Sequence, residues 1–417
     1  MRQGWSGIAL ICRLGISLVL VFASIASSQD PATARITREA SNQAAEADRL
    51  FKKGDFAAAL PLYQAERESR SKLGDDRYEA YAYRAIGCCL GELEEEAAAI
   101  EALKAAKVLD LKRDDPGFAG YDDLLIARAL SRLDRDTDAL KSLAEALPRL
   151  SQAADRDHQV EARLLMARCL INLGRLDLAN AQRLLIVKLL DELDLPNLSA
   201  EFAEIQATLD RRQGCVGLAF ERLSDARAYY QAEQKLPESA KVDRSLAETL
   251  VELGLFEAAE AMFSISAEEF HNLGDEWSSG EALMALASVR LDLKKPTEAV
   301  EAATLAEARF QAVGEEEAVI RALVVRSQSL DIAGDRAGAE KAVDRALTLS
   351  GKVDRDRPEE AVRLLLLAAD LAARSRDSGR VEFHLKAAKQ AAERSIDPRW
   401  KALVAERSAR LGSNKTK

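Results

Sequence analysis

The chain has 417 residues, of which 48% are hydrophobic, 31% are charged and 5% are aromatic, and its formal net charge is −10. This length exceeds the size at which one compact core keeps growing, so we expect either several domains or a repeat array. The acidic balance makes nucleic acid a poor general partner. Runs rich in Ala, Leu, Glu and Arg recur from end to end, and because these residues favour helices we expect an all-α fold.

Residues 1–28 have the pattern of a signal peptide. A short basic segment precedes an apolar run over residues 14–26, and small residues at 26–28 would suit cleavage. A run of 13 residues is too short to cross a bilayer as a helix. We therefore predict export to the periplasm or the extracellular space. An uncleaved membrane anchor over residues 7–26 is the alternative.

From residue 40 onward, small residues recur with a period of 40. One column contains eight alanines followed by a glycine: Ala59, Ala99, Ala139, Ala179, Ala219, Ala259, Ala299, Ala339 and Gly379. A second column, twelve residues earlier, is small in eight of nine cases: Ala47, Gly87, Ala127, Ala167, Ala207, Ala247, Ala287, Ser327 and Leu367. Two columns in a fixed phase do not arise from composition alone. They predict nine repeats over residues 40–390, preceded by an N-terminal tail at residues 29–39.

Each repeat is expected to contain two helices divided by a tight turn. Glycine recurs five residues before the first column, where its freedom to adopt positive φ would end a helix: Gly54, Gly174, Gly214, Gly254 and Gly334. Four residues after the column, an apolar residue gives the second helix a buried face: Tyr63, Leu103, Leu143, Leu223, Phe263, Val343 and Phe383. After the ninth repeat, Pro398 and a polar sequence predict a capping helix and a polar tail within residues 391–417.

This order of small residues, turn glycine and aromatic or leucine residue resembles the tetratricopeptide repeat (TPR) family. The unit is 40 residues long, which is similar to the longer repeats of kinesin light chains and spindle-orientation scaffolds. The resemblance implies an α-solenoid, a right-handed superhelix of about nine antiparallel helix pairs. It also implies binding of other molecules along the concave face.

The sequence contains no recognisable motif for catalysis or for a cofactor. His158, His271 and His384 stand at different phases of the repeat, so they are not placed to share a metal. No zinc-ligand spacing, nucleophile elbow or phosphate-binding glycine loop occurs. We therefore expect a protein that is not an enzyme and that uses no cofactor. The cysteines beyond residue 28 form no disulfide pattern and are predicted to be free thiols: Cys88, Cys89, Cys169 and Cys215.

By the resemblance, the first helix of each pair lines the concave groove. The residues predicted to face it in repeats two to six include a row of cations and one asparagine: Arg84, Arg128, Arg132, Arg168, Asn172, Arg211, Arg212 and Arg244. Guanidinium groups hold carboxylates by charge-assisted, often bidentate bonds, so this row predicts a site for an extended peptide or an acidic protein tail. In the alternative, the cations pair with acidic residues of neighbouring helices: Glu161, Glu201, Glu204 and Glu248.

In repeats seven to nine the matching face is apolar: Met284, Ser288, Leu291, Val324, Leu364, Ala368 and Leu371. Burial within the superhelix is expected there, whereas an exposed patch would mark a second contact site or a dimer seam.

Together these observations favour an exported, non-catalytic scaffold that binds a peptide or a partner protein along its concave face. A ligand- or peptide-sensing regulatory module is one alternative. A self-associating structural subunit, and hence a homo-oligomer, is another. The expected partner is a protein or peptide, with no nucleic acid, and with a membrane only if the N-terminal segment is uncleaved.

Overall fold

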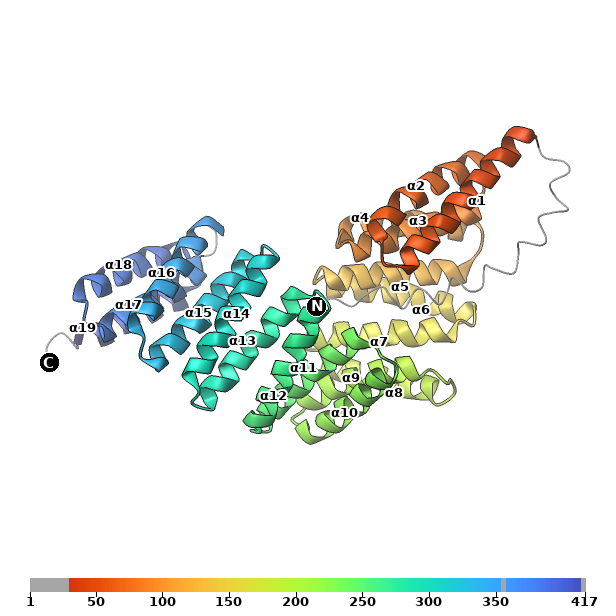
Figure 1. The fold of residues 1–417 in the computed structure, drawn as a ribbon. Coiled ribbons are helices and arrows are strands. Elements are labelled where there is room, and N and C mark those ends of the chain that lie inside the picture. Colours follow the sequence, from red (N-terminus) through yellow and green to blue (C-terminus); the bar gives the residue numbers. More distant parts are fainter. Residues whose placement is uncertain (1–29, 354–357, 414–417) are drawn as a thin grey trace. The chain divides into compact units, whose positions relative to one another are not determined.

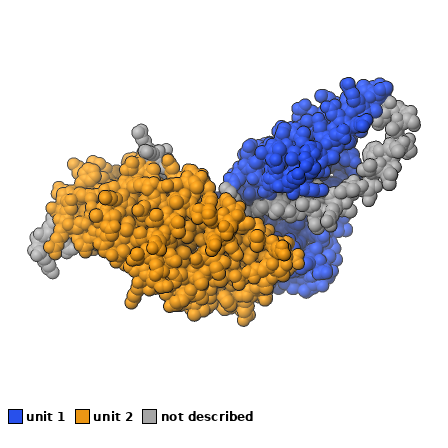
Figure 2. Space-filling model, in the orientation of Figure 1, with its two compact units in different colours: residues 1–209 blue, residues 210–417 orange. Residues whose placement is uncertain are grey.

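In the computed structural model, residues 30–353 and 358–413 are described, and they form nineteen helices and no strand. The signal peptide predicted for residues 1–28 lies outside these ranges. The chain divides into two compact units, residues 1–209 and 210–417 (Figure 2). None of the helices in the described ranges is both long and apolar enough to span a membrane.

The helices follow one another as antiparallel pairs joined by short turns, which confirms the predicted all-α solenoid (Figure 1). The first unit contains α1 (Pro31–Lys52), α2 (Phe56–Leu73), α3 (Asp76–Glu92), α4 (Glu96–Lys112), α5 (Pro116–Arg132), α6 (Asp136–Gln152), α7 (Arg156–Asn172), α8 (Leu176–Leu190) and most of α9 (Pro196–Arg212). The second unit contains α10 (Val216–Ala232), α11 (Leu236–Glu252), α12 (Phe256–Asn272), α13 (Glu276–Asp292), α14 (Pro296–Ala312), α15 (Glu316–Ala333), α16 (Arg336–Val353), α17 (Pro358–Arg374), α18 (Ser378–Arg394) and α19 (Pro398–Ser413).

Residues with positive φ follow the helices at intervals of 20 residues, and the turn between α8 and α9 is an exception. Within the first eight pairs they are Gly54, Glu94, Asp134, Gly174, Gly214, Gly254, Lys294 and Gly334. Between pairs they are Gly74, Asp114, Ala154, Gln234, Gly274 and Gly314. An aspartate often caps the helix that follows, as at Asp55, whose carboxylate accepts from the amide of Ala58 at 3.2 Å. The 40-residue period is therefore present in the turns as well as in the core.

The two predicted columns of small residues lie where helices touch. Each alanine of the first column, from Ala59 to Ala339, is completely buried. Gly87, in the second column, shows why a small residue is needed, because a Cβ atom there would lie 2.7 Å from Cγ of Leu103. Close approach of the backbones lets larger side chains fill the space between pairs. The predicted helix pairs are confirmed for repeats one to eight.

The ninth repeat is displaced by two residues, and the prediction of an unbroken period is wrong there. Its turn residue is Arg376, with a φ of 60°, and not Arg374. Gly379 is exposed, and Val381 is buried in its place. Phe383, predicted to be in the core, is 67% exposed. α16 is one residue longer than α14, and four residues separate α16 from α17 where three separate α14 from α15. Together these displace both helices of this repeat by two residues.

The displacement also changes which side of α17 is buried. Leu364, Ala368 and Leu371 were assigned to the groove face with burial as the expected outcome, and they are buried in the core of the second unit. Their burial is thus a consequence of the shifted register. Met284 and Val324 are partly buried against the same core.

Both ends differ from the predicted boundaries. α1 begins at Pro31, so residues 31–39 form its first turns and not a tail. At the other end α18 extends to Arg394, and the capping helix is α19. Asp370 of α17 pairs with Arg407 and, at 3.0 Å, with Arg410, which attaches α19 to the last helix pair.

Candidate functional site

The predicted site residues all lie on odd-numbered helices, but they are divided between the two units. In the first unit, α3, α5 and α7 carry Arg84, Arg128, Arg132, Arg168 and Asn172. In the second unit, the end of α9 and α11 carry Arg211, Arg212 and Arg244.

Arg84 belongs to the core of the first unit. Its Nε donates to Oδ1 of Asp122 at 2.6 Å, and its side chain also pairs with Asp110. Burial opposes the charge of Arg84, but the two carboxylates hold its pKa above the ordinary value. Burial in turn raises the pKa of Asp122 to about 8, although a guanidinium lies beside it. Because it is buried and paired, Arg84 is not available to a partner.

Arg128 and Arg168 connect successive repeats. Arg128 donates to Glu161 at 3.1 Å, and Arg168 donates to Glu201 at the same distance. Both contacts join residues that are 33 positions apart. Two of the pairings of the sequence-based alternative are thus present in the structure.

Arg132 and Asn172 turn toward the even-numbered helices. Nε of Arg132 lies 2.9 Å from a carboxylate oxygen of Glu96 in α4. Nδ2 of Asn172 donates to Asp136 in α6 at 3.0 Å. These two residues stabilise contacts between helices, so the members of the predicted row in the first unit are all engaged within the protein.

In the second unit, two of the three predicted cations have no ion-pair partner among the described residues. Arg211 pairs with Glu248 at 3.0 Å and with Glu252 at 2.6 Å. Arg212 is exposed, and Arg244 is half-buried. The Nε of Arg244 is shielded from solvent and has no hydrogen-bond acceptor within the described part of the chain. The Nε–H of Arg244 is therefore a hydrogen-bond donor that the described residues leave unsatisfied.

Arg244 lies on a partly exposed face of α11, α13 and α15, which we call the open face. Its acidic residues already have partners, since Glu281 accepts from Arg321 at 2.8 Å and Glu248 is held by Arg211. Its centre is apolar and partly buried. The open face consists of Arg244, Glu248, Glu281, Met284, Ser288, Leu291, Arg321, Val324 and Gln328.

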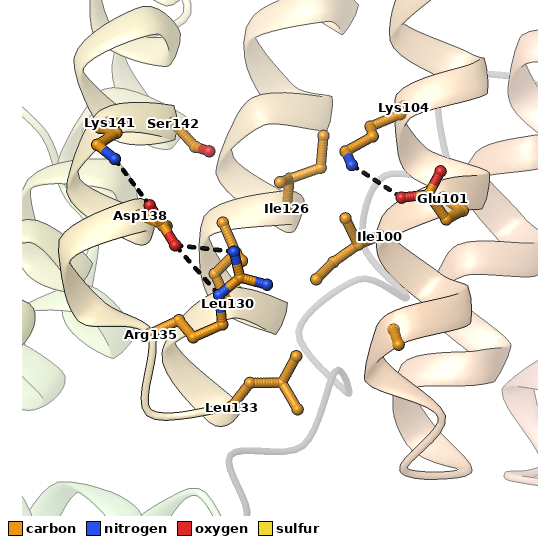
Figure 3. A pocket seen from close by; sticks show the side chains of 11 residues that line it. Ile100, Glu101, Lys104, Ile126, Leu130, Leu133, Arg135, Asp138, Lys141 and Ser142 are labelled. Atoms are coloured by element: carbon orange, nitrogen blue, oxygen red, sulfur yellow. Dashed lines mark hydrogen bonds and ion pairs between the residues drawn. The ribbon is translucent and has the colours of Figure 1, made fainter.

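A pocket of about 330 Å³ lies between α4, α5 and α6 of the first unit (Figure 3). Its charged rim is paired with itself, as at Asp138, which accepts from Arg135 at 2.8 Å and from Lys141 at 2.9 Å. Its floor is apolar and is formed by Ile100, Ile126, Leu130 and Leu133. An apolar side chain would fit this pocket, but it contains no group placed to act as a nucleophile or a general base.

The remaining chemistry-bearing groups do not form a site. In residues 30–353 and 358–413, no three His, Cys, Asp or Glu side chains are grouped so as to hold a metal. All four cysteines of these ranges are free thiols, and only Cys215 is exposed. Burial raises the pKa of Cys89 and of Cys169 to about 12, so these thiols stay protonated and unreactive.

The structure has a TPR-type repeat fold, as the sequence predicts. It is similar to the apo form of RapI (TM-score 0.61, 13% identity), with 71% of this chain and 84% of that chain covered. It is also similar to the apo form of the quorum sensor NprR from B. thuringiensis (TM-score 0.61, 12% identity), with 82% and 94% covered.

A third similar structure is a signal transduction ATPase with a tetratricopeptide repeat sensor from Pyrococcus horikoshii (TM-score 0.62, 14% identity). The match covers 84% of this chain but spans only 55% of that protein. No protein-family model and no curated protein matches the sequence. These similarities establish the fold alone.

Two features of the candidate surfaces were not predicted from the sequence. One is Glu252, which shares Arg211 with Glu248 and so neutralises part of the predicted row. The other is the exposed apolar side of α8, where Leu184 is 67% exposed. Comparison of the repeats position by position would have found Leu184, because no other repeat from one to eight has a large apolar residue there.

Proposed function

We propose that the protein is a non-catalytic interaction scaffold that binds an extended peptide, or the tail of a partner protein, across the open face. The observation that carries this proposal is Arg244. Its side chain is half-buried and its shielded Nε has no acceptor among the described residues, and an unsatisfied donor that is withdrawn from water gains from a charge-assisted bond to a carboxylate.

The surroundings of Arg244 favour a peptide over a small ion. Half-exposed apolar side chains such as Met284 and Leu291 lie on the helix that follows, and Ser288 is exposed between them. An extended segment with one carboxylate and alternate apolar residues could place its charge on Arg244 and its apolar groups along α13. The paired acids of this face would then supply little repulsion.

The predicted arginines of the first unit, in contrast to Arg244, are already engaged within the protein. Arg84 is buried, and Arg128 and Arg168 are engaged by acids of the next repeat. A partner that bound there would have to displace these contacts. The proposed site is therefore narrower than the row predicted from the sequence, and it centres on Arg244.

A regulatory form of the same proposal is peptide sensing, in which binding changes contacts with another protein. Two of the similar structures are those of a quorum sensor and of a protein with a tetratricopeptide repeat sensor. Sensing would require the binding face described above, so the two forms share one test.

Export by a signal peptide at residues 1–28, with the mature chain starting at residue 29, is part of the proposal. The support is the basic and apolar pattern of that segment. Mass spectrometry of the N-terminus of protein isolated from the host decides the point. A mature N-terminus near residue 29 agrees with export, and an intact Met1 contradicts cleavage.

The binding proposal is tested by site-specific photocrosslinking. A photoreactive amino acid is placed at Ser288, which is exposed in the centre of the open face, and, as a matched control, at Thr304, which is exposed on α14. We expect a crosslinked protein or peptide from host extract at position 288 and not at 304, and its loss with Arg244→Gln. Equal crosslinking at both positions, or crosslinking unchanged by Arg244→Gln, contradicts the proposal.

A further inference from the structure

The outward side of α8 has a large apolar residue, Leu184, at a position where the other even-numbered helices of repeats one to eight have none. Leu184 is 67% exposed. At the same position of the repeat, the other repeats from one to eight have only polar or small residues: Gln64, Lys104, Ala144, Ser224, Ser264, Thr304 and Asp344. Packing of the repeat therefore does not require leucine at this position, so the fold does not explain why Leu184 is exposed.

Leu184 is part of a strip along one side of α8. Leu178 and Leu185 are 52% and 43% exposed, so three leucines are in contact with solvent on one helix. At 3.6 residues per turn, six exposed residues lie on the same side. The α8 strip consists of Asp177, Leu178, Ala181, Leu184, Leu185 and Lys188.

The strip has an acid at one end and a base at the other. Asp177 and Lys188 are separated by three helical turns, and both are exposed. Neither residue lies within ion-pair distance of an opposite charge among the residues that the structure describes, although Glu192, one turn beyond Lys188, has its pKa lowered by Arg156 and, to a smaller extent, by Lys188. The charge pattern is therefore that of a helix that can pair with an inverted copy of itself.

We propose that the α8 strip joins two copies of this chain about a two-fold axis, with the two α8 helices antiparallel. When the axis passes between residues 182 and 183, Asp177 of one copy lies opposite Lys188 of the other. The same axis places the small Ala181 opposite the large Leu184. Opposite charges therefore meet at both ends, and a small residue meets a large one at the centre.

The edge of the strip is also complementary to itself. Leu178 of one copy lies beside Leu185 of the other, so all three leucines of each copy leave solvent. A parallel pair would instead place Asp177 against Asp177 and Lys188 against Lys188, which like charges oppose. The charges thus select the antiparallel arrangement.

One helix from each copy gives a small interface. Stable assemblies bury more than about 1,000 Å², so this contact forms a weak dimer whose population rises with protein concentration. The dimer does not depend on the open face, because the α8 strip lies within the first unit and the open face within the second.

Sedimentation velocity of the purified protein over a concentration series tests the dimer. The wild-type mass is expected to rise toward twice that of the chain. Asp177→Lys and Lys188→Asp each place like charges at both ends, so each raises the dissociation constant at least about tenfold. An equimolar mixture of these two variants restores the dimer, because each then meets opposite charges.

Two further variants separate the interface from the fold. Leu184→Gln introduces the residue that repeat one has at this position, so it should leave the helical circular dichroism unchanged and abolish the dimer. Leu305→Gln alters a leucine that is 50% exposed at the position equivalent to Leu185 on α14, and it should leave the dimer intact. A wild-type protein that stays monomeric, or single reversals that dimerise as well as wild type, overturns the proposal.

Discussion

Arg128 and Glu161 stand in successive repeats and are joined by an N–O distance of 3.1 Å across 33 residues of sequence. Arg168 and Glu201 repeat the spacing and the distance. Arginines that resemble a binding groove in the sequence are therefore, in the first unit, contacts that hold repeats together.

Removing Arg128 should destabilise the first unit without affecting partner binding. Its pair with Glu161 is partly exposed, so we expect Arg128→Gln to lower the free energy of unfolding by about 1 kcal/mol. Arg84→Gln leaves buried Asp122 without a cation and Asp110 with Arg113 alone, and it should lower the free energy of unfolding by about 3–5 kcal/mol. Urea denaturation followed by circular dichroism measures both. Equal losses for the two variants would contradict the different burial of these arginines.

The helix pairs were predictable because small residues and turns are set by local physics. Close helix approach needs alanine or glycine at fixed positions, as at Gly87. The displacement of the ninth repeat was not predictable from these columns, since α17 is apolar at almost every position and Ala369 fits the column as well as Leu367 does. Pro358 was the available signal, because proline also begins α5 and α9.

The candidate site was harder to predict for a physical reason. The sequence identifies which helix face carries Arg128 and Arg168, but their pairing depends on how one repeat is rotated against the next. Glu201 and Glu204 were both possible partners in the sequence, and the structure pairs Arg168 with Glu201. The distinction between arginines that have an ion-pair partner and Arg244, which has none among the described residues, requires the packed structure.

The buried pair of Asp122 and Asp110 around Arg84 predicts a pH dependence of stability. Burial raises the pKa of Asp122 to about 8, against about 3.9 in an unfolded chain. Between these values the folded state holds a proton that the unfolded state has released. The free energy of unfolding therefore falls as pH rises from about 4 to about 8, and the loss is complete above the folded pKa.

Asp122→Asn isolates this contribution. Asparagine resembles the protonated acid and can still accept from Arg84, so the variant should lose less stability than wild type between pH 5 and pH 8. Burial raises the pKa of Glu66 to about 7, so Glu66 also lowers the free energy of unfolding as pH rises. This contribution is the same in wild type and in the variant, and it cancels when the two are compared. Denaturation midpoints at the two pH values provide the measurement. Parallel pH profiles would show that Asp122 is ionised in the folded protein.

Ala154 occupies a turn position with a φ of 54°, which costs an L-residue about 1 kcal/mol. Ala154→Gly should therefore raise the free energy of unfolding by about that amount. Gly314 has the same role four repeats later, with a φ of 74°, and Gly314→Ala should lower it equally. Thermal denaturation of the two variants provides the check. A shift of the same sign in both would disprove the backbone argument.

Asp370 holds the capping helix through Arg407 and Arg410. Asp370→Ala should raise hydrogen exchange in α19 by about tenfold while the exchange of α13 stays unchanged, since the rest of the stack keeps its contacts. Arg399→Ala is the matched control, because Arg399 lies in α19 and pairs only with nearby Asp397. Equal exchange in both variants would mean that apolar contacts alone attach this helix.

Binding across the open face is tested most directly by affinity capture from host extract at low and high salt, using wild type, Arg244→Gln and Arg168→Gln in parallel. We expect a partner that wild type and Arg168→Gln retain at low salt, that high salt releases, and that Arg244→Gln binds at least about tenfold more weakly. Retention of the same proteins by Arg244→Gln, or by wild type at both salt concentrations, would contradict a carboxylate site at Arg244.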